Sequence, residues 1–248
     1  MVDALAWRHT FGVIVPSTNT IVQPEFDAMR PAGVSNHISR IAIPNDPVDD
    51  DDGFLQLMNN IRKAMMPAIN SVMTCEPDSI VMGMSAETFW DGKGGAETLR
   101  KRLEDRSNKA VTMGSDAVIA ALKAFRGVKN IAVVTPYMPT GDEQVRRFFT
   151  DYGFPVIALK GLKCPSPVAI AQVSGSALRS VVRELDSDKV EAIVQCGTNL
   201  CMAEVAAEAE RWLGKPVIAI NTATYWHALR SNGIVDKVQG FGSLLAEH

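Results

Sequence analysis

The chain reads Val190-Glu191-Ala192-Ile193-Val194-Gln195-Cys196-Gly197-Thr198-Asn199-Leu200 at the point where an apolar run gives way to a polar turn. A short apolar run bounded by polar residues is typical of a buried parallel strand. Residues 201–213 then predict an amphipathic helix that ends at Gly214. Open α/β sheets bind ligands outside the carboxyl ends of their strands, so we expect Cys196 to face a cleft. Helix N-terminal amides nearby would favour its thiolate form.

Composition excludes several classes of function. The 248 residues carry a net charge of −3 without a basic stripe, which argues against nucleic-acid binding. No apolar run approaches the ~20 residues of a membrane span, and no signal peptide opens the sequence. We therefore expect a cytoplasmic protein that does not associate with membranes, built as one large domain or two lobes.

Metal and nucleotide motifs are missing from the sequence. The four cysteines show no CxxC spacing, and the four histidines form no HExxH-like cluster. Neither GxGxxG nor GxxxxGK[ST] occurs, so a nucleotide cofactor is not expected. The acidic run 49–52 is interpreted as a solvated helix entry or loop and not as a cation site. We predict an enzyme without metal or cofactor.

The sequence pattern repeats. Residues 11–19 form an apolar strand followed by proline and a polar loop, and residues 130–137 do the same. The strand before Ser85 is matched to the strand before Cys196, and residues 111–125 correspond to 217–230. Three matched strand–helix corners in one order predict an α/β fold with two lobes of the same build, whose strand-end loops meet at an interlobe cleft.

Neutral hydrogen-bonding groups would gather at this cleft. Such donors, with backbone N–H groups, can hold a carboxylate or a developing enolate, and a thiol can move a proton at the adjacent carbon or add to it. Each hydroxyl or amide, taken singly, is equally well explained by capping or turn chemistry. The expected set is Ser17, Thr18, Asn19, Ser85, Ser115, Tyr137, Cys196, Gly197, Thr198 and Asn221.

Several blocks resemble a known superfamily. Residues 15–20 with Glu25 are similar to the opening of maleate cis-trans isomerases, as are 135–138 and 222–230 to their later blocks. Residues 83–90 instead resemble a loop of arylmalonate decarboxylase. Both belong to the aspartate/glutamate racemase superfamily, and the resemblance spans residues 11 to 245. It implies two pseudo-symmetric Rossmann-like lobes, each with a mostly parallel sheet flanked by helices, an active site in the interlobe cleft and no cofactor.

The resemblance also implies roles for individual residues. Racemases and maleate isomerases carry one cysteine in each lobe, and the positions that we match to this pair are Ser85 and Cys196. The decarboxylase uses only the second cysteine, to protonate the enediolate that remains after carbon dioxide leaves. We therefore predict Cys196, Ser85 and Tyr137 as catalytic residues. The predicted substrate-binding residues are Ser17, Asn19, Met84, Gly197 and Thr198.

Three functions stay open. We place first an arylmalonate-decarboxylase-like reaction on a small dicarboxylate, with protonation by Cys196. The alternative is maleate-type cis-trans isomerisation, and a further alternative is a non-catalytic carboxylate-binding protein. By analogy with the family we expect a first lobe of residues 1–116, to which 224–248 returns, and a second lobe of 117–223. A homo-oligomer is also expected.

Overall fold

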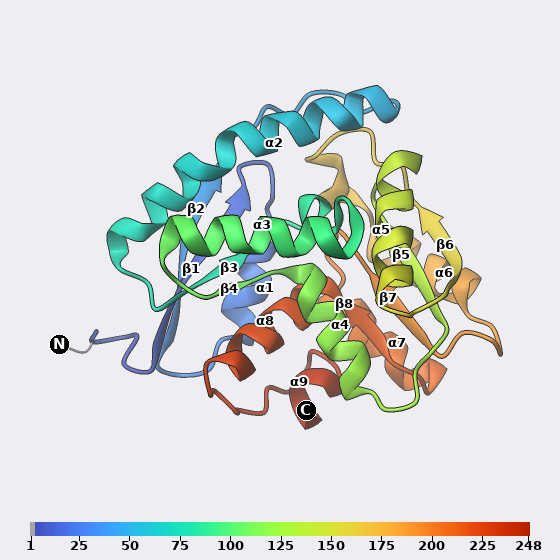
Figure 1. Ribbon diagram of the computed structural model, residues 1–248. Helices are drawn as coiled ribbons and strands as arrows, with labels where there is room; N and C mark the ends of the chain where they lie inside the picture. Colours follow the sequence, from blue (N-terminus) through green and yellow to red (C-terminus); the bar gives the residue numbers. More distant parts are fainter. Residues whose placement is uncertain (1–2) are drawn as a thin grey trace.

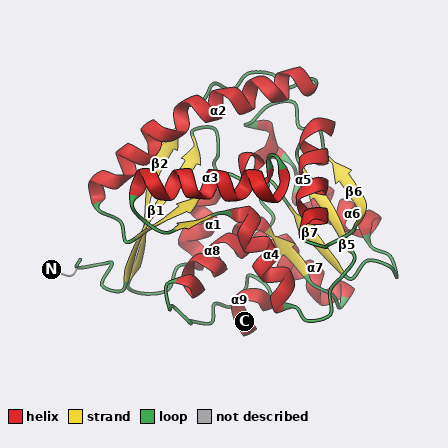
Figure 2. Cartoon of the chain, viewed as in Figure 1, coloured by secondary structure: helices red, strands yellow, loops and turns green. Residues whose placement is uncertain are grey.

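The computed structural model describes residues 3–248 and contains two separate parallel sheets (Figures 1 and 2). One four-stranded sheet has the order β2-β1-β3-β4, and the other has the order β6-β5-β7-β8. Every neighbouring pair is parallel. Adding four to each strand number converts the first order into the second, so the predicted pair of pseudo-symmetric α/β lobes is confirmed.

The elements of the N-terminal half alternate strand and helix. They are β1 (His9–Pro16), α1 (Val22–Met29), β2 (Val34–Ile41), α2 (Asp51–Val72), the short 3-10 helix η1 (Met73–Cys75), β3 (Ser79–Met82), the 3-10 helix η2 (Ala86–Phe89), α3 (Gly92–Ser107), β4 (Val111–Thr112) and α4 (Gly114–Ala124).

The C-terminal half repeats this alternation and adds one short helix. Its elements are β5 (Ile131–Thr135), α5 (Pro139–Asp151), β6 (Val156–Gly161), the 3-10 helix η3 (Ala169–Gln172), α6 (Gly175–Leu185), β7 (Ala192–Gln195), α7 (Ala203–Leu213), β8 (Val217–Ala219), α8 (Ile220–Ser231) and α9 (Ser243–Glu247).

Strand β5 shows why the central strands are mainly apolar. Successive side chains of a strand point to opposite faces of the sheet. Ile131 and Val133 enter the large core that contains most of the first lobe, whereas Ala132 and Val134 enter a smaller core beneath α6 and α7. Because helices cover both faces of the sheet, residues 131–134 are apolar on both faces, and the one polar residue of β5, Thr135, stands at its end.

The acidic run belongs to a helix entry. Asp50 precedes α2, and its Oδ1 accepts a hydrogen bond from the Gly53 amide at 2.9 Å. A carboxylate at a helix start satisfies a free amide and opposes the positive end of the helix dipole. The same helix start reaches the second lobe, since the Thr140 amide donates to Asp51 Oδ1 at 2.8 Å. In Figure 1 this end of α2 lies beside the top of α5.

Helix α8, which precedes the C-terminal helix α9, packs against the first lobe. Its Tyr225 ring lies 4.8 Å from that of Phe26 on α1, and the Tyr225 hydroxyl donates to Asn36 Oδ1 of β2 at 3.1 Å. Helix α4 lies beside α8, where Gly114 closely approaches Ile220. The lobe boundaries near residues 116 and 224 stay predictions. None of the helices formed by residues 3–248 has the length and apolar character that a membrane crossing requires.

Candidate active site

A small pocket of about 70 Å³ opens between the two lobes, at the carboxyl ends of the strands. Its polar side chains come from both lobes, and most of the remaining wall is apolar. No charged side chain of residues 3–248 is among those that line it. The lining comprises Pro16, Thr18, Asn19, Ile43, Val48, Phe54, Leu57, Ile61, Met84, Ser85, Ala86, Pro136, Tyr137, Met138, Cys164, Ser166, Pro167, Ile170, Gly197, Thr198 and Asn199.

Three of the predicted residues form one hydrogen-bonded group in this pocket. Ser85 Oγ lies 2.8 Å from the Tyr137 hydroxyl, and the Thr198 amide donates to Ser85 Oγ at 3.2 Å. Ser85 and Tyr137 are 2% and 5% exposed. Burial raises the pKa of the Tyr137 hydroxyl, so at neutral pH it is a hydrogen-bond donor. The group therefore offers neutral donors to an anion without supplying a full positive charge.

Local structure holds each hydroxyl in place. Ser85 precedes η2, and its carbonyl accepts from the Thr88 amide at 2.9 Å and from the Thr88 hydroxyl at 2.7 Å. The Tyr137 amide donates to Thr135 Oγ1 at 3.1 Å, and that hydroxyl donates to Asp142. The Tyr137 ring also contacts Phe54 of the first lobe, with 5.5 Å between ring centroids. These contacts fix the rotamers that a preorganised site requires.

Asn19 combines a capping role with a contact across the cleft. Its Oδ1 accepts from the Ile21 and Val22 amides at 3.0 and 2.9 Å, as expected of an asparagine before a helix. Its Nδ2 donates to Thr198 Oγ1 at 3.2 Å. The Thr198 hydroxyl in turn donates to the Gly83 carbonyl at 3.2 Å. Asn19 and Thr198 thus join the first lobe to the turn after β7.

Gly197 is required by the geometry of this turn. Its φ is +107°, and a Cβ atom built there would lie 2.4 Å from Pro136 Cδ. Any other residue would be strained in backbone conformation and would collide with the proline ring. The glycine therefore allows the Thr198 amide to approach the pocket from the end of β7.

Cys196 directly precedes Gly197 in the chain and is fully buried. It is not among the residues that line the pocket, although it is close enough to Tyr137 to contribute to the raised pKa of that hydroxyl when ionised. Burial raises the pKa of the Cys196 thiol well above its ordinary value, with a smaller contribution from the Asp142 carboxylate. The expectation of a favoured thiolate was wrong because burial dominates, and α7 begins only at Ala203 and not directly after the strand. The group present at neutral pH is the thiol.

The matching of Ser85 to Cys196 also needs correction. The Cys196 amide donates to Val134 O at 2.9 Å, directly after β7, and the Gly83 amide donates to Ile14 O at 2.8 Å, directly after β3. These two hydrogen bonds are equivalent in the two lobes, so the counterpart of Cys196 is Gly83. Ser85, two residues further, corresponds to Thr198. The first lobe consequently has no side chain at the position of the thiol.

Three other candidates, Ser17, Ser115 and Asn221, are not among the residues that line the pocket. The Ser17 side chain is exposed, and its hydroxyl bonds to the Ile43 backbone, accepting from N at 3.0 Å and donating to O at 3.1 Å. Ser115 is buried on α4 without a hydrogen-bond partner. Met84 does line the pocket.

Cys164 and Asn199 are among the lining residues that were not predicted from the sequence. Cys164 follows β6 and is 7% exposed, and burial raises the pKa of its thiol to about 11. Asn199 donates from Nδ2 to Pro167 O at 2.9 Å and accepts from the Thr20 amide at 3.0 Å, which ties three loops together. Both follow strand ends, so the rule that selected Cys196 could have found them.

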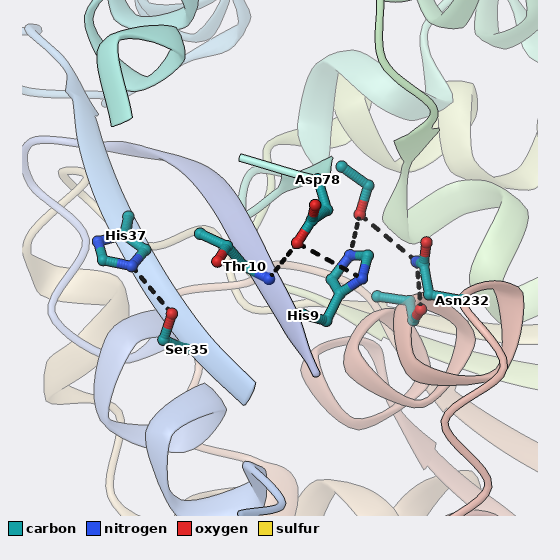
Figure 3. Close-up of polar contacts among 8 residues, drawn as sticks. His9, Thr10, Ser35, His37, Asp78 and Asn232 are labelled. Carbon is teal, nitrogen blue, oxygen red and sulfur yellow. Dashed lines mark hydrogen bonds and ion pairs between the residues drawn. The ribbon is translucent and has the colours of Figure 1, made fainter. Parts of the chain in front are cut away.

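A serine–histidine–aspartate group lies at the opposite, amino ends of β1 and β3 (Figure 3). His9 Nε2 is 2.8 Å from Ser79 Oγ, but His9 Nδ1 is 3.9 Å from Asp78 Oδ2, too far for a hydrogen bond. Asp78 Oδ2 instead accepts from the Thr10 amide at 2.7 Å. The aspartate–histidine hydrogen bond that a catalytic triad needs is therefore missing. The hydrogen bonds of this group instead join the amino ends of β1 and β3. Among residues 3–248, no cluster of at least three His, Cys, Asp or Glu side chains could hold a metal ion.

Comparison with known proteins agrees with this geometry. The model of the arylmalonate decarboxylase family matches residues 11–245. Maleate isomerase of Pseudomonas putida is 25% identical and covers 96% of this chain and 97% of its own length. Arylmalonate decarboxylase of Bordetella bronchiseptica is 28% identical over 67% of this chain and 70% of its own.

A solved structure shares the fold. A cysteine-to-serine mutant of Nocardia farcinica maleate cis-trans isomerase, with a covalently bound succinylcysteine intermediate, superposes with a TM-score of 0.87. It is 24% identical and covers 97% of this chain and 99% of that one. The chain belongs to the arylmalonate decarboxylase family, within the aspartate/glutamate racemase superfamily.

Proposed function

We propose that the chain is an enzyme that acts without a cofactor on a small dicarboxylate bound between the two lobes. The observation that carries this proposal is the contact of Ser85, Tyr137 and the Thr198 amide at one end of an apolar pocket. Such neutral donors suit a carboxylate that becomes an enediolate during the reaction. Family membership supports this enzyme over a non-catalytic binding protein.

Isomerisation of a maleate-type dicarboxylate is the first reaction to test. The Pseudomonas putida maleate isomerase matches nearly the whole chain, whereas the match to the decarboxylase covers 67% of it. This support reverses the order that we expected from sequence. In such a reaction a thiolate sulfur adds to one alkene carbon, and the electron pair moves into the adjacent carboxylate. Rotation about the new single bond and loss of the thiolate give the trans product.

Decarboxylation is the second candidate because a protonated Cys196 thiol is better suited to act as a general acid than as a nucleophile. Gly83 leaves the first lobe without a thiol at the corresponding position, and burial raises the pKa of the Cys196 thiol. In this reaction the bond between the central carbon and one carboxylate breaks, and carbon dioxide leaves into the apolar part of the pocket. The electron pair forms an enediolate held by Ser85 and Tyr137. The Cys196 S–H then protonates the carbon, and solvent returns the proton to sulfur.

The two candidates are separated by their products. The purified protein is incubated with maleate and, separately, with phenylmalonate, and the mixtures are followed by proton NMR. Fumarate supports isomerisation, whereas phenylacetate with carbon dioxide release supports decarboxylation. A Cys196→Ser variant is the matched control for thiol chemistry. Binding of both compounds with no turnover of these or of related unsaturated and substituted dicarboxylates would contradict the enzymatic proposal.

A further inference from the structure

Asn221 supports the Thr198 turn from behind. It lies in the first turn of α8 and is 1% exposed. Its Nδ2 donates to the Thr198 carbonyl at 2.9 Å and to Glu25 Oε2 at 2.6 Å, so both amide hydrogens are used. Its Oδ1 is buried without a hydrogen-bond partner. The orientation of the amide is therefore set by its two acceptors, one of which is a carboxylate.

Glu25 connects three elements at this point. It belongs to α1 of the first lobe, and its Oε1 accepts from the Ala203 amide, the first residue of α7, at 3.1 Å. Its Oε2 takes the hydrogen bond from Asn221 on α8. The pKa of Glu25 is raised to about 7, mainly by burial and to a smaller extent by the Glu204 carboxylate, against the hydrogen bonds from Asn221 and the Ala203 amide. Both protonation states are accordingly accessible near neutral pH.

The two states of Glu25 favour opposite orientations of Asn221. An ionised carboxylate only accepts hydrogen bonds, which keeps Nδ2 directed toward Glu25 and Thr198. A protonated carboxyl group gains one donor, and the amide that it contacts has one unused acceptor, Asn221 Oδ1. To accept that proton the amide must turn over, which removes Nδ2 from the Thr198 carbonyl. The only chemical change is one proton taken from solvent.

The Thr198 turn is part of the pocket, so its position affects binding. The Thr198 amide donates to Ser85 Oγ, and its hydroxyl joins Asn19 to the Gly83 carbonyl. We propose that Glu25 and Asn221 are positioning residues that hold the Thr198 turn in its substrate-binding geometry while the Glu25 carboxylate is ionised. Only the identity of the bound anion in this inference rests on the proposed function.

The groups around Glu25 leave this titration distinct. Helix α7 and the loop before it contribute Glu204, which is exposed, and the Cys201 thiol, whose pKa burial raises. Helix α8 contributes Tyr225, whose pKa burial also raises. Strand β2 contributes Arg40, whose guanidinium donates to Asn19 O at 2.8 Å and to Gln23 Oε1 at 2.9 Å. The ordinary pKa values of a thiol and a phenol both lie above the raised pKa of Glu25, so these two groups titrate separately from it.

A titration of the whole chain followed by NMR tests the pair without requiring turnover. The Thr198 amide resonance and the Glu25 carboxyl carbon are followed between about pH 5 and pH 9. We expect one shared midpoint near the pKa of Glu25, and we expect the Thr198 shift to disappear in Glu25→Gln. Glu204→Gln is the matched control on an exposed neighbouring carboxylate, and Asp142→Asn excludes the other raised carboxyl near the site. Both should keep the Thr198 titration.

Kinetics gives the second readout. If a substrate turns over, Glu25→Gln should raise KM by roughly tenfold at pH 8, with a smaller change in kcat, as expected from loss of an oriented hydrogen bond. The rise of kcat/KM through the Glu25 pKa should also vanish. Different midpoints for Glu25 and Thr198 in the wild type, or an unchanged Thr198 titration in Glu25→Gln, would overturn the inference. Lack of turnover by the wild type would contradict only the proposed function, because the NMR titration decides the positioning role.

Discussion

The hydroxyl groups of Ser85 and Tyr137 come from different lobes and lie 2.8 Å apart. Ser85 follows the third strand of the first sheet, and Tyr137 follows the first strand of the second sheet. Under the proposed function, a substrate anion that enters between them would replace one interlobe hydrogen bond with two bonds to itself. Substrate binding and the fit of the lobes are therefore linked at this contact.

Removing either hydroxyl should weaken the site by a limited amount. We expect Ser85→Ala and Tyr137→Phe each to lower kcat/KM by about 10- to 100-fold, since a lost hydrogen bond is worth about 1–3 kcal/mol. The double variant should lose less than the product of the single losses, because the two groups contact each other. Ser17→Ala is the control, since Ser17 is exposed and should retain normal kcat/KM. Full additivity of the two losses would show that the hydroxyls act separately.

The two buried thiols can be separated by substitution. Cys196→Ser should lower kcat by about 10²- to 10⁴-fold, because a hydroxyl is a far weaker acid than a thiol and general acid catalysis is worth about that much. Circular dichroism should show an unchanged fold. Cys164→Ser, at the thiol that lines the pocket, should change KM more than kcat. A larger loss of kcat in Cys164→Ser than in Cys196→Ser would contradict the assignment of the chemistry to Cys196.

Gly83→Cys should introduce a thiol opposite Cys196. A Cβ atom at this position would lie 3.0 Å from Val22 Cγ1 and 3.2 Å from the Ile14 carbonyl, so we expect a loss of about 1–3 kcal/mol in stability from overpacking. In return, the two-thiol arrangement should add maleate isomerisation or racemisation of a chiral product. Chemical denaturation measures the first effect, and chiral chromatography with NMR measures the second. Ser85→Cys, two residues away, is the comparison and should add neither activity.

The free energy of unfolding should fall as pH rises from the ordinary glutamate pKa toward 7. Burial raises the pKa of Glu25 from 4.5 to about 7, so over this range the folded chain binds a proton that the unfolded chain has released. The corresponding loss is about 3 kcal/mol, complete above the folded-state pKa and absent below the unfolded-state pKa. Urea unfolding at several pH values should show that the free energy of unfolding depends less steeply on pH in Glu25→Gln than in the wild type. Equal slopes would mean that Glu25 is not buried as a carboxyl group.

Asp142 should contribute a second, separate part of this dependence. Burial raises its pKa from 3.8 to about 6, partly opposed by the hydrogen bond from Thr135. Its destabilising effect should therefore accumulate as pH rises from about 4 and should level off above the raised pKa. Asp142→Asn should remove that lower part of the slope and leave the part due to Glu25. Unfolding curves of both single variants and the double variant measure the two parts.

The sequence by itself determined the strands, the repeat and the edge of the sheets where the site lies. Apolar runs such as 131–134 can only be buried between helices, and the order of three matched corners was enough to predict two lobes of one build. Ser85, Tyr137 and Thr198 were found because polar residues directly after parallel strands meet at one edge.

Only the tertiary structure decided which side chains meet, because contacts across the cleft depend on the relative placement of two separately folded sheets. The sequence does not show at which residue a strand ends, so it could not align the two lobes residue by residue. Ser85 was therefore paired with Cys196, whereas the backbone hydrogen bonds show that the counterpart of Cys196 is Gly83. The thiol form of Cys196 depends on burial, which no local pattern encodes. Glu25 and Asn221 are 196 residues apart in sequence, and their contact exists because α8 packs on the first lobe.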